Sequence, residues 1–376
     1  MILDQIKADI VKVNNEKKEG VFHYLPFPER MSRLGELLGG IGKEDYYLLT
    51  AGSGVGKSTL MYDFVNNFPK EFLDTYDNID IKLTVFVNML EESVKTLTMR
   101  AIIGKLSAKG IDLNLRDLQG RRLTPIDDYV ISEIIEASES LELERKHYSD
   151  KYNVYYSDIG NPFGFYKSVR NYLAKSGKYF DANNNEVSFS KILKGEVPDY
   201  SYKPNNPKEL IIVVSDHLKL YSAESGKKWY DTLEYFSQIY CRRILNLKYG
   251  CAVINVQQQA SASESIIFDK NGKPIIENTY PTTHNLGDIT TTQRDATIIL
   301  GVWNPHKYGV EKDTVAGLSI DYAAFKRKGM PIRVIKPLKN RDGNEGGTLV
   351  CWVDFKTRKF YQLPKTQEGI DALLSN

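Results

Sequence analysis

The sequence predicts an α/β fold with a mainly parallel central sheet flanked by helices, and two observations carry this prediction. A glycine-rich segment, residues 51–59, follows a strand-forming run at 46–50 and leads into a helix-forming run at 60–65. Further along, aliphatic runs at 82–88 and 210–216 each end in polar residues before a loop or a helical stretch. Strands that alternate with helices in this way are typical of parallel sheets that are buried on both faces.

The glycine-rich segment has the strand, loop and helix order that a phosphate-binding loop requires, which disfavours the alternative of a chance turn. Its glycines let several backbone N–H groups point at one spot, and the helix adds the positive end of its dipole there. In such a loop Lys57 reaches the β- and γ-phosphates, and the Ser58 hydroxyl is a ligand of Mg²⁺. Ala51 stands where the strict pattern has glycine, so it must avoid or tolerate a positive φ. The residues expected to bind ATP are Ser53, Gly54, Val55, Gly56, Lys57, Ser58 and Thr59.

The charges of the 376-residue chain nearly cancel, leaving a formal net charge of +2. No global field indicates a nucleic-acid partner, so any site for a polyanion must be local. Cys241, Cys251 and Cys351 lie far apart in apolar or helical surroundings, which suits structural residues in a reducing compartment. Neither a signal peptide nor a membrane-spanning run is evident. We therefore expect a soluble cytoplasmic protein, in the host cytoplasm if it is viral.

Three parts are expected along the chain: an N-terminal helix or linker at 1–29, an ATPase domain at 30–365 and a C-terminal tail at 366–376. Two segments within the ATPase domain, near 107–150 and 176–208, are expected to be insertions. The second insertion is rich in polar residues and has no sustained period, which is typical of a partly mobile surface segment.

The first helix is expected to carry a narrow apolar stripe. Its apolar residues recur at helical spacing, at Leu3, Ile6, Ile10 and Val13. A stripe this narrow is either packed on its own domain or offered to a neighbour, and the sequence leaves both open.

Carboxylates stand at the ends of two predicted strands, where chemistry gathers in open α/β sheets. Glu91 follows the strand at 82–88 and could orient or deprotonate the water that attacks the γ-phosphate. The alternative for Glu91 and Glu92 is electrostatic support of a helix N-terminus. Asp216 ends the clearest aliphatic run and is expected to bind Mg²⁺ together with Ser58, although an aspartate at a strand end is often a helix cap.

Two further strand ends and one long loop carry polar residues. Gln257 follows a strand at 251–256 and can hydrogen-bond the γ-phosphate, or it can simply begin a polar loop. His217 is expected to make a packing or polar contact, because no second His or Cys lies at ligand spacing. Residues 260–292 form a long polar stretch in which a small hairpin is expected at 271–274, and loops of this length are usually functional or disordered.

The order of these parts resembles the RecA-like P-loop NTPase motor domain of DnaB-type replicative helicases, over about residues 30–360. An Ala or Gly opens the phosphate loop in that family, so Ala51 fits. Lys219 and Val256 differ from the family's usual residues, and the amino-terminal domain through which its members meet primase is not found in the sequence. The matching blocks are Met89-Leu90-Glu91 with Arg100 nine residues later, Asp216-His217-Leu218-Lys219-Leu220, Val256-Gln257, Gln293-Arg294-Asp295-Ala296 and Lys339-Asn340-Arg341-Asp342-Gly343.

The resemblance implies a DNA helicase that hydrolyses ATP with Mg²⁺ at the subunit interfaces of a ring, expected to be a hexamer. It implies movement along single-stranded DNA in replication, with a primase or loader as a possible partner. The loops at 221–229, with Lys227 and Lys228, and at 260–292 would face a central channel and bind DNA. The alternative for Lys227 and Lys228 is a solvated loop. The alternatives for the protein are a RecA-like recombinase that forms filaments and an ATP-gated DNA-binding assembly that does not unwind.

Lys339 and Arg341 are candidates for a catalytic role in a neighbouring subunit. They lie between strand-forming runs around 333–335 and 348–352, so a glycine turn is expected to put Arg341 at a hairpin tip. Lys339, two residues earlier, is expected to point from the same side of the strand. The resemblance implies that the arginine enters the neighbour's nucleotide site, where it stabilises charge in the transition state. The alternative is that both are ordinary surface charges.

Overall fold

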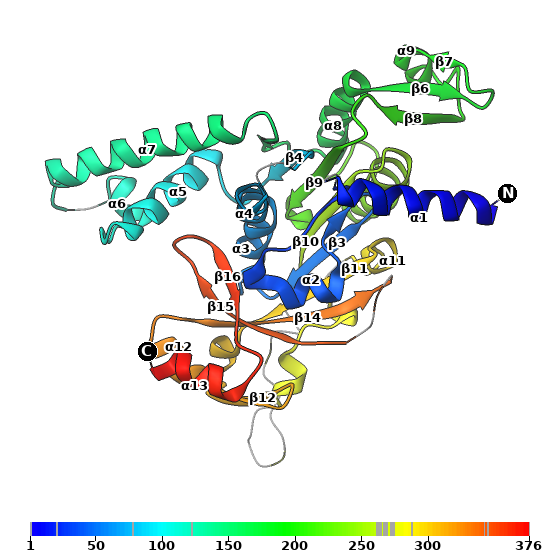
Figure 1. Cartoon of the computed structure of the whole chain (residues 1–376). Helices are drawn as coiled ribbons and strands as arrows, with labels where there is room; N and C mark the ends of the chain where they lie inside the picture. The colour runs from blue at the N-terminus through cyan, green and yellow to red at the C-terminus, as the bar shows by residue number, and fades with distance from the viewer. Residues whose placement is uncertain are drawn as a thin grey trace.

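The computed structural model describes residues 2–19, 22–76, 79–121, 123–260, 265, 270, 275–286, 289–341, 343 and 346–375. A nine-stranded sheet with the order β16-β15-β14-β11-β3-β10-β9-β4-β5 forms the centre of the molecule (Figure 1). All neighbours from β11 to β5 run parallel, whereas β14, β15 and β16 continue the sheet in antiparallel fashion. The strands are β3 (Tyr46–Ala51), β4 (Lys82–Met89), β5 (Tyr152–Ser157), β9 (Glu209–Asp216), β10 (Ala252–Gln258), β11 (Ile298–Trp303), β14 (Ile332–Asn340), β15 (Leu349–Asp354) and β16 (Lys359–Gln362).

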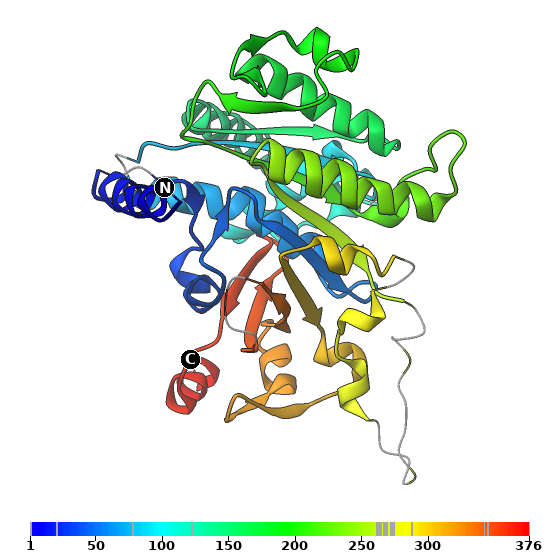
Figure 2. The same cartoon turned by 90° about the vertical axis from the view of Figure 1, so that its right-hand side faces the viewer.

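The predicted mainly parallel sheet is therefore confirmed, and burial explains why its strands read as aliphatic runs. Every residue of β3 and of β9 is buried, so both faces of these strands are covered. Figures 1 and 2 show helices on either side of the sheet. One face packs on α2 (Ser32–Leu38), α3 (Lys57–Tyr62), η2 (Asp63–Asn67) and α4 (Phe68–Thr75), and the other on α8 (Pro162–Ser176), α10 (Trp229–Tyr235), η4 (Phe236–Lys248) and α11 (Thr292–Asp295).

Both expected insertions are folded. The first consists of α6 (Leu115–Leu118) and α7 (Asp128–Tyr148), which pack on α5 (Val94–Ala108). The second contains a three-stranded antiparallel sheet of β6 (Gly177–Asp181), β7 (Glu186–Val187) and β8 (Tyr200–Pro204), with α9 (Phe189–Leu193) beside it. Tyr179 of β6 is buried in the core of the second face, so this segment is an anchored subdomain, although its sequence shows no sustained period.

The two ends of the chain behave differently. The N-terminal helix α1 (Ile2–Lys18) projects from the body, and its stripe is exposed, with Leu3 at 71% and Ile10 at 64%. Its own domain does not cover the stripe. The expected C-terminal tail is instead a helix, α13 (Gln367–Ser375), which buries Ile370 in a third core cluster.

This third cluster also includes residues of β12 (Lys312–Val315), β13 (Leu318–Asp321) and α12 (Tyr322–Arg327), which lie beside the antiparallel edge of the sheet. The described part of the chain also contains two short strands, β1 (Tyr24–Leu25) and β2 (Ile41–Gly42), and several short 3₁₀ turns. The hairpin expected at 271–274 lies outside the described residues. Within the residues that the structure describes, no helix is both long and apolar enough to cross a membrane.

Candidate nucleotide-binding site

The glycine loop joins β3 to α3, as predicted. Gly54 and Gly56 take the left-handed conformation with φ of 68° and 119°, and α3 begins directly after Gly56 at Lys57. Ala51 is the last residue of β3 and has an extended conformation, so it needs no positive φ. The missing first glycine of the strict pattern therefore costs this loop no backbone strain.

Lys57 folds back over the loop that precedes it. Its ammonium donates hydrogen bonds to the carbonyls of Ala51 at 3.1 Å and Gly52 at 2.8 Å, and the side chain is 8% exposed. These carbonyls hold the charge beside the backbone N–H groups at the start of α3. A point charge in this position fits a polyphosphate laid along the loop.

Asp216 and Ser58 meet beside the loop. The Ser58 hydroxyl donates to Asp216 Oδ1 at 3.2 Å, and the carbonyl of Asp216 accepts from the amide of Leu90, which directly follows the adjacent strand β4. Burial raises the pKa of Asp216 to about 6; the nearby charge of Glu91 adds to this rise, and the hydrogen bond from Ser58 opposes it. A buried carboxylate with a raised pKa and an adjacent hydroxyl are oxygen donors that fit Mg²⁺, which is usually bound by one or two carboxylates and substrate phosphates.

The alternative role of Asp216 as a helix cap does not apply. The residue that caps the following 3₁₀ turn, η3 (Leu218–Leu220), is His217, whose Nδ1 accepts from the Lys219 amide. His217 thus makes the local polar contact expected of it, and the Asp216 carboxylate is left to face the loop.

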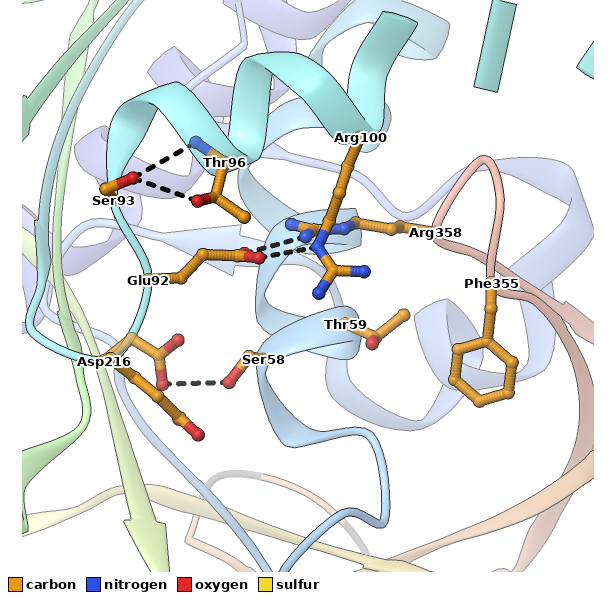
Figure 3. Close-up of a pocket in the computed structure, with 10 residues that line it drawn as sticks. Ser58, Thr59, Glu92, Ser93, Thr96, Arg100, Asp216, Phe355 and Arg358 are labelled. Atoms are coloured by element: carbon orange, nitrogen blue, oxygen red, sulfur yellow. Dashed lines mark hydrogen bonds and ion pairs between the residues drawn. The ribbon is translucent and has the colours of Figure 1, made fainter. Parts of the chain in front are cut away.

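Glu91 and Glu92 line a cavity of about 420 Å³ next to Ser58 and Asp216, and they are engaged differently (Figure 3). Glu92 accepts from Arg100 Nε at 2.5 Å and from Arg358 at 2.8 Å. Burial acts to raise the pKa of Glu92, but the charges and hydrogen bonds of the two arginines hold it below its usual value.

Glu91 is exposed, and its carboxylate makes no hydrogen bond or ion pair with a residue that the structure describes. The helix that follows, α5, is capped by Ser93, whose hydroxyl accepts from the Thr96 amide. The helix end is thus satisfied without Glu91. The two neighbouring carboxylates therefore differ: two arginines bind Glu92, and neither binds Glu91.

Two cations that the sequence reasoning missed support the loop from the antiparallel side. Arg333, near the start of β14, is buried; its Nε donates to the carbonyl of Val55, and its Nη1 donates to Asn304 Oδ1 at 3.1 Å. Lys307 donates to the carbonyl of Ser53 at 3.1 Å. Burial lowers the pKa of Arg333 to about 10. The signal for Arg333 was an arginine inside an aliphatic strand, a position that charge rarely occupies without a partner.

Lys339 and Arg341 lie at the opposite end of the sheet from the loop. Asn340 pairs with Ile298, which in turn pairs with Tyr47 at the start of β3, whereas the phosphate loop follows the end of β3. The expected hairpin is confirmed, because β14 and β15 are consecutive antiparallel neighbours. Its strands pair only at the start of β14, whereas the residues that directly precede Arg341 pair with β11. Arg341 is nevertheless exposed, and both side chains reach the same backbone segment, so the expectation of a common side is confirmed.

Comparisons with known proteins address the fold. No protein-family model and no curated protein sequence matches the chain. Among solved structures, the ATPase domain of G40P superposes with a TM-score of 0.59 at 16% identity, covering 96% of this chain and 99% of that one. A DnaB-like replicative helicase, whose structure is described together with its interactions with primase, superposes with a TM-score of 0.57 at 16% identity, covering 94% of this chain and 67% of that one.

The chain has the fold of a DnaB-like helicase ATPase domain. The RecA-like, DnaB-like fold that the order of motifs predicted is therefore confirmed over almost the whole chain. At this level of identity the likeness establishes the architecture, and the roles of single residues rest on the geometry.

The side chain of Gln257, the expected γ-phosphate sensor, makes its hydrogen bonds with the residues before and at the start of α11. Its Nε2 donates to the carbonyls of Leu286 at 2.7 Å and Ile289 at 2.9 Å, and its Oε1 accepts from the Thr292 hydroxyl at 2.7 Å. The side chain is buried on the α11 face of the sheet. In this conformation the side chain of Gln257 holds Leu286, Ile289 and Thr292.

The two candidate DNA-binding lysines lie at the surface, in the loop before α10. Lys227 forms an ion pair with Glu224 at 2.9 Å and lies 3.9 Å from the centre of the Tyr235 ring, whereas Lys228 is exposed at the start of α10. Much of the second predicted channel loop, 260–292, lies outside the described residues, so its predicted DNA contacts stay a prediction.

Proposed function

We propose that this protein is an ATP-driven motor that hydrolyses ATP at the interfaces between its subunits and moves along single-stranded DNA. One observation carries the proposal: the groups that fit ATP hydrolysis are divided between the two ends of one sheet. The phosphate loop, Asp216 and Glu91 lie at the carboxyl ends of the parallel strands, and Arg341 lies at the opposite end. A second subunit stacked against the first would unite them.

Within one subunit the chemistry would be assigned as follows. Lys57 and the loop amides bind the β- and γ-phosphates, and Ser58 and Asp216 are the protein's ligands for Mg²⁺. When bound, Mg²⁺ neutralises charge on the phosphate oxygens. Glu91 orients the attacking water and accepts its proton, since its carboxylate faces the same cavity and makes no ion pair there.

The neighbouring subunit supplies Arg341, with Lys339 beside it. A planar guanidinium can bind the γ-phosphate through two N–H groups and stabilise the charge of the transition state. The exposed stripe of α1 offers an apolar surface for assembly, because its own domain leaves it uncovered. A closed ring, with six subunits as the expected number, would repeat one such interface.

The DNA would pass the loops at 221–229 and 260–292. Lys228, the exposed lysine of the first loop, is available for a backbone phosphate. The DnaB-like helicase of similar fold is described with its interactions with primase, and a primase or a loader is a candidate partner of this chain in replication.

The test is unwinding of a forked DNA with ATP and Mg²⁺, together with images of the particles on single-stranded DNA. We expect strand separation by the wild type, none by Lys57→Ala, and closed rings. Filaments with strand exchange would support a recombinase instead. Rings that bind DNA and hydrolyse ATP without unwinding would support an ATP-gated DNA-binding assembly.

A further inference from the structure

The short helix α11 is hydrogen-bonded to the cationic pair at the end of β14. Lys339 donates from Nζ to the carbonyls of Gln293 and Ala296, at 2.6 Å each. The Arg341 guanidinium donates to the carbonyl of Arg294 at 3.3 Å, and the Arg341 amide donates to the carbonyl of Thr297. Both cations are thus held by the backbone of α11 and of the residues directly after it, and Figure 1 shows α11 beside the end of β14.

The same helix is hydrogen-bonded to the end of β10. Thr292, its first residue, is fully buried, and its hydroxyl contacts Gln257 Oε1 at 2.7 Å and the carbonyl of Ile289 at 2.8 Å. Its last residue, Asp295, accepts from Ser237 at 2.6 Å. This four-residue helix therefore links Gln257 on one side to Lys339 and Arg341 on the other.

We propose that α11 is a positioning element that couples Gln257 at the end of β10 to the Lys339–Arg341 pair, with Thr292 as the residue that makes the coupling. The inference rests on the proposed function, in which Arg341 acts in the next subunit. A helix of one turn has little stability of its own, so its position follows its contacts. When Gln257 shifts, Thr292 and the rest of α11 shift with it, and the Arg341 side chain offered to the neighbouring subunit is displaced.

The size of the effect follows from the geometry that catalysis demands. Displacing a group by about 1 Å can cost about a hundredfold in rate. Removing the Thr292 hydroxyl also leaves the buried Gln257 Oε1 without this donor, so the contact cannot be lost without rearrangement. Thr292→Val keeps the shape and removes the donor, and Thr292→Ser keeps the donor and serves as the matched control.

The test uses mixed assemblies of the full chain. Lys57→Ala subunits lack their own site but offer Arg341, and Arg341→Ala subunits have an intact phosphate loop, so their mixture is expected to hydrolyse ATP. Adding Thr292→Val to the Lys57→Ala subunits should lower that turnover by at least about tenfold. Adding Thr292→Val to the Arg341→Ala subunits, or adding Thr292→Ser to either kind of subunit, should change that turnover little. A decrease that is equal for both placements of Thr292→Val would overturn the proposal, since it would show a general structural role.

Amide hydrogen exchange supplies a readout that does not depend on hydrolysis. In the otherwise wild-type protein, Thr292→Val should speed exchange in peptides that cover 289–297 and 338–341, and Thr292→Ser should not. Unchanged exchange at 338–341 would overturn the coupling whatever the turnover. Faster exchange with undiminished turnover in the mixture would overturn the positioning role. If the mixture without any change at Thr292 hydrolyses nothing although its subunits co-assemble, the trans role of Arg341 fails, and the coupling to catalysis fails with it.

Discussion

The two ends of the central sheet hold their charges in opposite ways. At the carboxyl ends of the parallel strands, the Lys57 ammonium donates to two carbonyls of the loop, and the Ser58 hydroxyl donates to Asp216. Burial there raises the pKa of the Asp216 carboxyl. At the other end Arg341 is exposed, and its guanidinium donates to the carbonyl of Arg294 at 3.3 Å. The first end holds its charged groups in a hydrogen-bonded arrangement around the phosphate loop. The second end presents an exposed cation that cannot reach the phosphate loop of its own subunit.

The strand β14 spans the distance between the two ends of the sheet, with Arg333 near its start and Arg341 directly after its last residue. Arg333 contacts the phosphate loop, and Arg341 lies eight residues further, roughly 26 Å away at about 3.3 Å per residue. No side chain bridges that distance. The same residue type is therefore a support of the site at one end and a candidate donor to another subunit at the other.

The largest expected effect comes from Arg341→Ala. Turnover should fall by about 10³–10⁵-fold, as where arginine fingers are known, with the midpoint of thermal unfolding unchanged because the side chain is exposed. Arg333→Ala is the matched comparison on the same strand. It should lower the free energy of unfolding by about 1–3 kcal/mol, because the carbonyl of Val55 loses a donor in a buried site.

Measuring the ATP turnover and the thermal unfolding of both variants tests this difference between the two arginines. Mixing with Lys57→Ala subunits should restore hydrolysis to Arg341→Ala and leave Arg333→Ala impaired, since Arg333 serves its own loop. A rescue of Arg333→Ala, or a large loss of stability in Arg341→Ala, would contradict the division between the two ends.

The next effect separates the adjacent carboxylates. Glu91→Gln should bind ATP normally and lower turnover by about 10²–10⁴-fold, the usual contribution of a general base. Glu92→Gln should weaken ATP binding with a smaller loss of turnover, because it frees Arg100 and Arg358 at the cavity wall. Nucleotide affinity and single-turnover hydrolysis distinguish them. An inactive Glu92→Gln with an active Glu91→Gln would shift the assignment by one residue.

The sequence predicted the phosphate loop better than the surroundings of Arg341, because the structure of the loop depends on residues that are close together in the chain. Residues 46–62 contain strand, loop and helix in one continuous stretch, so their geometry follows from spacing. Arg333 reaches the loop from almost 280 residues away, and no local pattern announces that contact. The hairpin expected around Arg341 was predicted from two neighbouring strand-forming runs and the glycine turn between them, whereas the pairing of β14 with β11 depends on strands that are more distant in sequence.

A third prediction concerns Asp216 and pH. Its pKa of about 6 lies above the usual value, so between about pH 4 and 6 the folded protein binds more protons than the unfolded chain, and stability from this group falls as pH rises. In the nucleotide-free protein, Asp216→Asn should therefore be more stable than wild type at pH 7, by on the order of 1–3 kcal/mol.

The difference should shrink as pH falls through 6 towards 4, where the wild-type carboxyl is protonated. Chemical unfolding of both proteins at several pH values measures it. With ATP and Mg²⁺ the order at pH 7 should reverse, because Asp216→Asn lacks the charged ligand. A wild type that is the more stable protein at every pH without nucleotide would show that the carboxylate is well solvated.

The smallest expected effect lies in the loop before α10, and it tests whether DNA affinity is local. The net charge of +2 is too small to bind DNA by itself, so single lysines should be visible in the salt dependence. Each phosphate contact on a single strand contributes about 0.7 to the slope of log affinity against log salt. Lys228→Ala should lower the slope by about that amount, and Lys227→Ala by less, because Glu224 already neutralises Lys227.

Replacing Lys178 and Lys194 of the second insertion by alanine is the control, since both are exposed and far from the loop in sequence. Fluorescence anisotropy of labelled single-stranded DNA between low and physiological salt gives the slopes. Equal losses from the loop and the insertion variants would mean that charge acts at long range over the whole surface and that neither lysine contacts the DNA.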